Sequence, residues 1–155
     1  MKDTQICCFT GHREIARDRI SHITSKLDTV IKGLIQKGVT RFRSGGARGF
    51  DTLAALAVIK QKREFKHIHL ELVIPCINQT GGWSEEEIAK YHYILNHSDK
   101  VHTQISKEQA PGEFNQKLVD GSDFCVAFME RDTGYTVRTV DYAKSKQIMI
   151  YNISE

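Results

Sequence analysis

The sequence predicts an α/β domain of three layers, in which helices cover both faces of a mainly parallel sheet. Two observations predict this class. Short apolar runs alternate with helical segments along the whole chain, an order that favours a parallel sheet with right-handed crossovers. The apolar runs also lack polar alternation, as is typical of strands covered on both faces. With 155 residues and no internal repeat or low-complexity linker, we expect residues 1–155 to form a single domain.

The predicted strands are short apolar runs bounded by turn residues: 5–11, 39–45, 69–76, 100–104, 123–129 and 148–153. Helices are predicted between them over 14–37, 50–62, 84–96, 112–121 and 137–146. The first helix carries apolar residues spaced by three and four, and Gly38 ends it. The helix over 50–62 is apolar on most sides, which predicts that it is buried against the sheet. Ser84 followed by Glu87 fits a capping box at the start of the next helix.

Composition and charge exclude some classes of protein. The net charge of +3, with 26% charged and 40% hydrophobic residues, is ordinary for a globular protein. The basic residues are scattered, whereas nucleic-acid-binding surfaces usually carry a dense basic stripe, so a nucleic-acid partner is possible but not favoured. The four cysteines form no CxxC pair or metal spacing, which predicts a reducing, cytoplasmic setting and no metal. Without an apolar run of about 18 residues we expect no membrane span.

Unusual residues follow four of the predicted strands, and in a sheet of this kind ligands bind at the carboxyl ends of the strands. The candidate ligand-binding residues, at these ends and at Asp120 before the strand over 123–129, are Thr10, Gly11, His12, Arg13, Ser44, Gly45, Gly46, Arg48, Asp51, Gln79, Trp83, Asp120, Gly134, Tyr135, Thr136 and Thr139. Glycine lets backbone N–H groups approach an anion closely, and a helix N-terminus adds unpaired donors and partial positive charge. The segment 44–51 therefore predicts a phosphate-binding loop; the alternative is a tight strand-to-helix turn without a ligand.

Several of these side chains have two interpretations that the sequence leaves open. Arg13 and Arg48 either pair with phosphate through the planar guanidinium or remain solvated. Trp83 either stacks on a base or caps the core. His12 is a general acid or base, or a hydrogen-bond donor. Asp51 either caps its own helix or hydrogen-bonds ribose hydroxyls.

The motifs CCFTGHR (7–13), SGGARGFDTLAALAVI (44–59), LVIPC (72–76), LVDGSDFCVAF (118–128) and GYTVRTVDYAKSKQIMI (134–150) together resemble the SLOG superfamily. This Rossmann-like group joins the DNA-processing Smf/DprA proteins with the Lonely Guy phosphoribohydrolases, and the chain resembles most its small stand-alone YpsA-like branch. The resemblance implies that the chain binds a nucleotide or an NAD-derived, ADP-ribose-like ligand at the strand ends, in order to sense or sequester it. It implies no cofactor. It also implies self-association into a homo-oligomer.

The chain departs from the hydrolase branch at one position that matters. That branch carries a glutamate which helps to cleave the N-glycosidic bond, and here Thr139 occupies the equivalent position. A hydroxyl is no carboxylate base near neutral pH, so we expect binding without turnover. One alternative is an N-glycoside hydrolase that uses Asp51, Asp120 or Glu113, and another is a protein that binds single-stranded nucleic acid.

Overall fold

The computed structural model describes residues 4–74, 80–103, 116–131 and 134–154. Within them the strands form one sheet of six strands in the order β4-β3-β2-β1-β5-β6, and every neighbouring pair is parallel. The strands are β1 (Gln5–Gly11), β2 (Val39–Ser44), β3 (His69–Val73), β4 (Lys100–His102), β5 (Phe124–Phe128) and β6 (Met149–Asn152). The strand order reverses between β1 and β5, so the carboxyl ends of these two strands form the switch point at which ligands bind in open α/β sheets.

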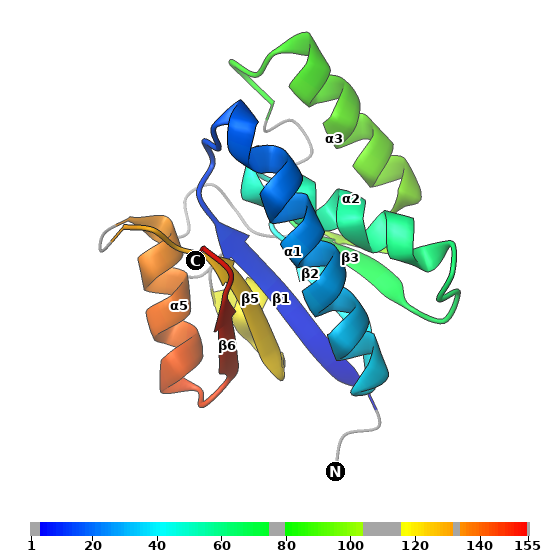
Figure 1. Cartoon of the computed structure of the whole chain (residues 1–155), viewed down its shortest axis with the longest axis vertical. Helices are drawn as coiled ribbons and strands as arrows, with labels where there is room; N and C mark the ends of the chain where they lie inside the picture. The colour runs from blue at the N-terminus through cyan, green and yellow to red at the C-terminus, as the bar shows by residue number, and fades with distance from the viewer. Residues whose placement is uncertain (1–3, 75–79, 104–115, 132–133, 155) are drawn as a thin grey trace.

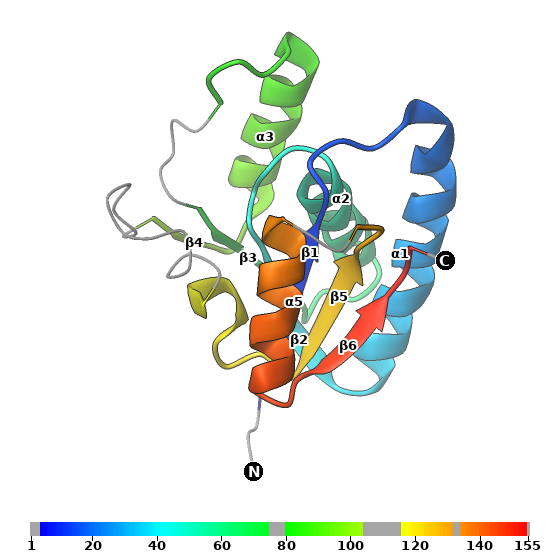
Figure 2. The same cartoon turned by 90° about the vertical axis from the view of Figure 1, so that its left-hand side faces the viewer.

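Helices cover both faces of this sheet, as predicted. One face carries α1 (Arg17–Gln36) and α2 (Phe50–Lys62), with α3 (Glu85–His97) beside α2, and the other face carries α5 (Tyr135–Ser145). Figure 2 shows α5 in front of the sheet and α2 behind it. Of the predicted helix over 112–121, residues 116–119 are helical and 112–115 lie outside the described residues. The three-layer α/β class is confirmed.

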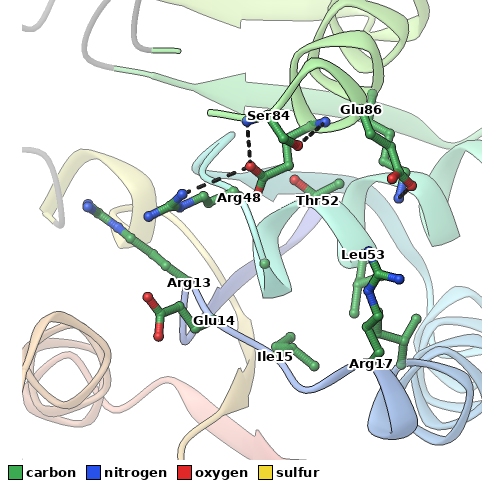
Figure 3. Close-up of a pocket in the computed structure, with 13 residues that line it drawn as sticks. Arg13, Glu14, Ile15, Arg17, Arg48, Thr52, Leu53, Ser84 and Glu86 are labelled. Carbon is green, nitrogen blue, oxygen red and sulfur yellow. Dashed lines mark hydrogen bonds and ion pairs between the residues drawn. The ribbon is translucent and has the colours of Figure 1, made fainter. Parts of the chain in front are cut away.

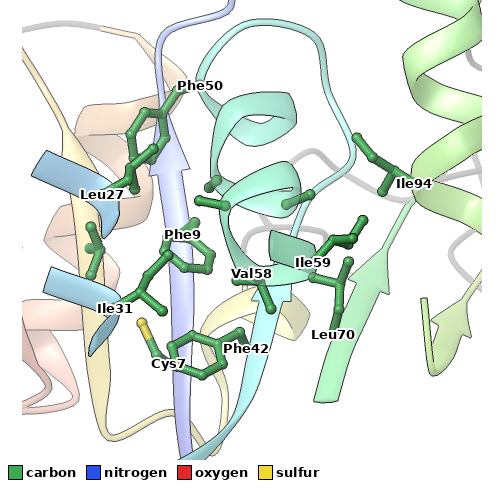
Figure 4. Packing of buried hydrophobic residues seen from close by; sticks show 14 of the residues in the cluster. Cys7, Phe9, Leu27, Ile31, Phe42, Phe50, Val58, Ile59, Leu70 and Ile94 are labelled. Carbon is green, nitrogen blue, oxygen red and sulfur yellow. The ribbon is translucent and has the colours of Figure 1, made fainter. Parts of the chain in front are cut away.

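The larger part of the core lies between the sheet and the α1–α2 layer. Aromatic side chains from the three neighbouring strands β2, β1 and β5 and from the start of α2 stack there, with Phe9 and Phe42 centroids 6.0 Å apart and Phe50 and Phe128 centroids 5.9 Å apart. Figure 4 shows Val58 and Ile59 of α2 directed into the same cluster. The predicted burial of this helix on most sides is confirmed.

The prediction that α1 begins at residue 14 is wrong by three residues. Ala16 is extended (φ −62°, ψ 139°) and α1 begins at Arg17. Apolar periodicity does not reveal this, because the preceding segment is held by a contact distant in sequence: Phe50 N–H donates to the carbonyl of His12 (3.0 Å). Among the helices that the structure describes, none combines the length and the apolar character needed to cross a bilayer.

Candidate functional site

The loops that follow β1 and β2 are packed against each other backbone to backbone. Gly49 has φ +81°, and a Cβ at this position would lie 2.3 Å from the carbonyl oxygen of Arg13. A Cβ on Gly11 would lie 2.4 Å from the ring of Phe50. Because neither position has room for a side chain, both glycines are required for the two strand ends to meet.

The β2–α2 loop is stabilised by its own polar side chains. Ser44 Oγ donates to the carbonyl of Asp51 (3.1 Å) and accepts from Gly46 N–H (3.3 Å). Asp51 Oδ2 accepts from Ala47 N–H (3.3 Å). Ser44, like Gly45, is buried, so these residues shape the loop from within.

Asp51 is half-buried as a residue, and its carboxyl is poorly solvated. Desolvation raises the pKa of this carboxyl to about 7, although the Ala47 N–H and the charge of Arg13 both act in the opposite direction. Asp51 therefore titrates near neutral pH at the base of the loop. Its hydrogen bond to Ala47 fits the capping interpretation, and a contact with ribose stays a prediction.

A hollow of about 320 Å³ opens where these loops meet the start of α5, and we call it the strand-end hollow. Its lining residues are Gly11, His12, Arg13, Glu14, Arg48, Arg131, Gly134 and Thr136. The structure thus brings Arg48 of the β2–α2 loop together with Gly134 and Thr136 at α5, 86 and more positions apart in sequence.

The N-terminus of α5 borders this hollow, and the segment that leads into α2 lines it at Arg48. The N-cap residues are Gly49 and Gly134, and among the described residues no side chain caps either helix. The first backbone N–H groups of a helix have no intrahelical partner, and they carry partial positive charge. The N-terminus of α5 and Arg13, Arg48 and Arg131 therefore surround a space in which Glu14 supplies negative charge. The arrangement suits an anion such as a phosphate.

Arg131 is a lining residue that the sequence interpretation missed. It follows β5, and the rule that selected the other candidates, an unusual residue after the carboxyl end of a strand, also applies to it. Glu14 was missed for a different reason, because it lay inside the helix predicted to begin at residue 14.

A backbone hydrogen bond holds the neutral His12 ring in one tautomer. Glu130 N–H donates to His12 Nε2 (2.9 Å), so this nitrogen is an acceptor and the proton of the neutral ring is on Nδ1. Desolvation lowers the pKa of His12, the charge of Arg131 lowers it further, and Glu130 partly opposes them. Since Nε2 is already engaged, this geometry disfavours His12 as a general base through that nitrogen.

Other predicted site residues lie away from the hollow or inside the protein. Trp83 is half-buried, and its ring meets Tyr91 edge to face (5.4 Å between centroids), which fits the core interpretation. Thr10 and Thr139 are buried. Asp120 lies on the α5 side of the sheet, where it accepts a hydrogen bond from Tyr142 Oη (2.5 Å). Gln79, Glu113 and the side chain of Tyr135 lie outside what the structure describes.

A second hollow of about 360 Å³, which we call the adjoining hollow, lies against the starts of α1, α2 and α3 (Figure 3). It shares Arg13, Glu14 and Arg48 with the strand-end hollow. Arg48 Nη1 lies 3.9 Å from Glu87 Oε1.

Glu87 also completes the capping box of α3. Ser84 N–H donates to Glu87 Oε1 (2.8 Å), and Glu87 N–H donates to Ser84 Oγ (3.1 Å). The capping box predicted for these two residues is confirmed. In the described part of the chain, no group of three or more His, Cys, Asp or Glu residues is placed to hold a metal ion.

Comparison with known proteins places this site in context. A family model, YpsA, described as the YspA SLOG family, matches residues 2–154. A UPF0398 protein of Halalkalibacterium halodurans is 32% identical over 134 residues, which cover 83% of this chain and 70% of that protein.

Two solved structures share the fold at low sequence identity. DNA processing protein A (DprA) from Streptococcus pneumoniae superposes with a TM-score of 0.66 at 14% identity, covering 95% of this chain and 49% of that one. DprA from Helicobacter pylori, in a structure that concerns its binding of single-stranded DNA, has a TM-score of 0.61 at 15% identity and covers 94% and 63% of the two chains. At these identities the likeness is one of fold.

Proposed function

The chain belongs to the YspA SLOG family, and on that premise we propose that it binds a nucleotide or an NAD-derived ligand in the strand-end hollow without turning it over. One observation carries the proposal: the N-terminus of α5, which no described side chain caps, borders the same small hollow as Arg13, Arg48 and Arg131. Such a set of donors matches a phosphate group, which accepts from backbone N–H groups and from planar guanidinium groups.

Three of the groups considered for catalysis are unsuited to it, which supports binding without turnover. Cleavage of an N-glycosidic bond requires a group that stabilises positive charge at the sugar and a base that activates water. Thr139 is 1% exposed and offers only a hydroxyl. His12 Nε2 already accepts from Glu130 N–H, and Asp51 already accepts from Ala47 N–H inside the loop.

Isothermal titration calorimetry with AMP, NAD, ADP-ribose and cyclic ADP-ribose tests the proposal. We expect at least one of these ligands to bind, and Arg48→Ala to weaken that binding about 10- to 100-fold, the effect of removing one charge-assisted hydrogen bond. Arg63→Ala, at the exposed opposite end of α2, is the matched control and should bind as the wild type does. Absence of heat across the whole panel at millimolar ligand contradicts the proposal.

The hydrolase alternative is separated from this proposal by its product. Each ligand that binds is incubated with the protein, and the free base is quantified by chromatography. Release of base faster than in a buffer blank would replace binding without turnover by N-glycoside hydrolysis.

Binding of single-stranded DNA is the second candidate function. It is favoured by the arginines at the strand ends and by the fold shared with DprA, whose Helicobacter pylori form binds single-stranded DNA. Fluorescence anisotropy of a labelled oligonucleotide at two salt concentrations tests it. If phosphate contacts dominate, affinity falls with a log–log slope of about −0.7 per phosphate neutralised; no binding at low salt would exclude this candidate.

A further inference from the structure

We propose that the adjoining hollow is a second subsite, which receives the second nucleoside of a ligand built from two nucleosides joined through phosphate. The inference rests on the function proposed above, because the phosphate linkage would occupy the strand-end hollow. The inference names the class of ligand: the site binds NAD-like dinucleotides, or one dinucleotide step of a single strand, in preference to a mononucleotide.

The two hollows adjoin through shared side chains. Arg13, Glu14 and Arg48 line both of them. In Figure 3, Arg13 and Arg48 extend to the same side, away from Ile15 and Leu53 of the adjoining hollow. The two arginines therefore stand at the junction, where a bridging phosphate could be contacted from both compartments.

The sizes of the hollows favour a ligand that occupies both. The volumes of about 320 and 360 Å³ each lie at the lower limit of typical ligand pockets, which is roughly 300 Å³, whereas the two together fall well within the usual range. A mononucleotide would leave one compartment filled only by water.

The lining of the adjoining hollow suits a base and its sugar. Ile15, Ile20 and Leu53 supply an apolar surface on which the face of a base can lie. Thr52 and Ser84 bring hydroxyl groups. Such a mixture of an apolar wall with a few polar groups is typical of small-molecule sites.

Charged groups surround this apolar surface. Glu86 provides a carboxylate that can accept from the exocyclic amino group of a base, and Arg17 and Lys90 provide positive charge. Lys90 Nζ pairs with Glu86 Oε1 at 3.3 Å. Lined in this way, the hollow differs from the arginine-rich strand-end hollow, and the two suit different parts of one ligand.

Glu87 links the subsite to the phosphate position. Its carboxylate is fixed by the capping box, and Arg48 Nη1 lies 3.9 Å from it, beyond hydrogen-bond length. Arg48 is thus attracted to Glu87 without a short bond. A phosphate at the junction could draw the guanidinium away at small cost.

The test fills the adjoining hollow and compares three ligands. Ile20→Trp adds a large side chain on the lining of this hollow, and Arg17→Glu changes its charge at an exposed position with little risk to folding. Val30→Trp is the matched control, because Val30 is on the same helix but lines a different hollow beside β6. Affinities for AMP, NAD and the dinucleotide pdApdA are measured by calorimetry, after thermal melts show that each variant is folded.

We expect the wild type to bind NAD or pdApdA about tenfold or more tightly than AMP. Ile20→Trp should abolish this preference and leave the AMP affinity within about twofold, Arg17→Glu should reduce it, and Val30→Trp should preserve it. A preference for NAD over pdApdA identifies a small-molecule ligand, and the reverse identifies a nucleic-acid step. Equal affinity for AMP and both dinucleotides overturns the second subsite while the proposed function stands. No binding by the wild type overturns both.

Discussion

The titration of Asp51 offers a quantitative test of the β2–α2 loop. Desolvation raises the pKa of its carboxyl from 3.8 to about 7 in the folded protein. A group whose folded pKa is raised contributes stability that is fully present below its unfolded pKa and is lost as pH rises through its folded pKa. The loss therefore falls between about pH 4 and pH 7. At 1.36 kcal/mol per pKa unit, it amounts to about 4 kcal/mol at most, of which roughly 2.5 kcal/mol falls between pH 5 and pH 8.

The substitution Asp51→Asn removes this titration and keeps an oxygen that accepts from Ala47 N–H. The free energy of unfolding of both proteins is measured by urea denaturation at pH 5, 6, 7 and 8. Relative to the wild type, the variant should gain about 2.5 kcal/mol between pH 5 and pH 8. Asp18→Asn, on the exposed first turn of α1, controls for the loss of one carboxylate. A difference between Asp51→Asn and wild type that stays constant across this pH range would refute the reasoning.

Three further predictions concern Glu87, the packing at Gly49 and self-association of the chain. Glu87→Gln keeps the capping box, since glutamine also serves at that position, but it removes the charge that attracts Arg48. Calorimetry should show that the variant binds the ligand about two- to fivefold more tightly than the wild type. Weaker binding would contradict the role given to Glu87. Gly49→Ala should lower the free energy of unfolding by about 2–5 kcal/mol, because it combines backbone strain with overlap onto Arg13. Gly33→Ala in α1, where an added Cβ meets nothing within 4 Å, should raise the free energy of unfolding by up to about 1 kcal/mol. Similar effects of the two changes in urea denaturation would contradict the packing argument. The predicted self-association should appear as a mass of at least two chains in light scattering after size-exclusion chromatography, and a mass of 17.7 kDa at all concentrations would exclude it.

The site could be predicted in part from the sequence, for reasons that depend on distance along the chain. The glycines and arginines after β1 and β2 are close in sequence to the strands that position them, so their place at a strand end followed from the alternation of strands and helices. The capping box of Ser84 and Glu87 was predictable for the same reason, because both partners lie within one helical turn.

Contacts between segments that are distant in sequence could not be predicted from such local patterns. His12 Nε2 meets Glu130 N–H across 118 positions, so its occupied lone pair follows from the pairing of β1 with β5 and from no local pattern. Asp120 was a candidate from the motif over 118–128, yet the fold places it beside Tyr142 on the α5 side of the sheet. The distance between Arg48 and Glu87 likewise depends on how α3 packs on α2.

The sequence alone determined the α/β class, the parallel sheet, the buried helix over 50–62 and the glycine-rich strand ends, because periodicity, turn residues and capping act over a few neighbouring residues. Only the tertiary structure decided that Arg48, before α2, and the start of α5 line one hollow, that Arg131 lines it too, and that a second hollow adjoins it at Arg13 and Arg48. Which side chains share a hollow depends on strand order and helix packing, and these result from burying the whole apolar surface of the chain at once.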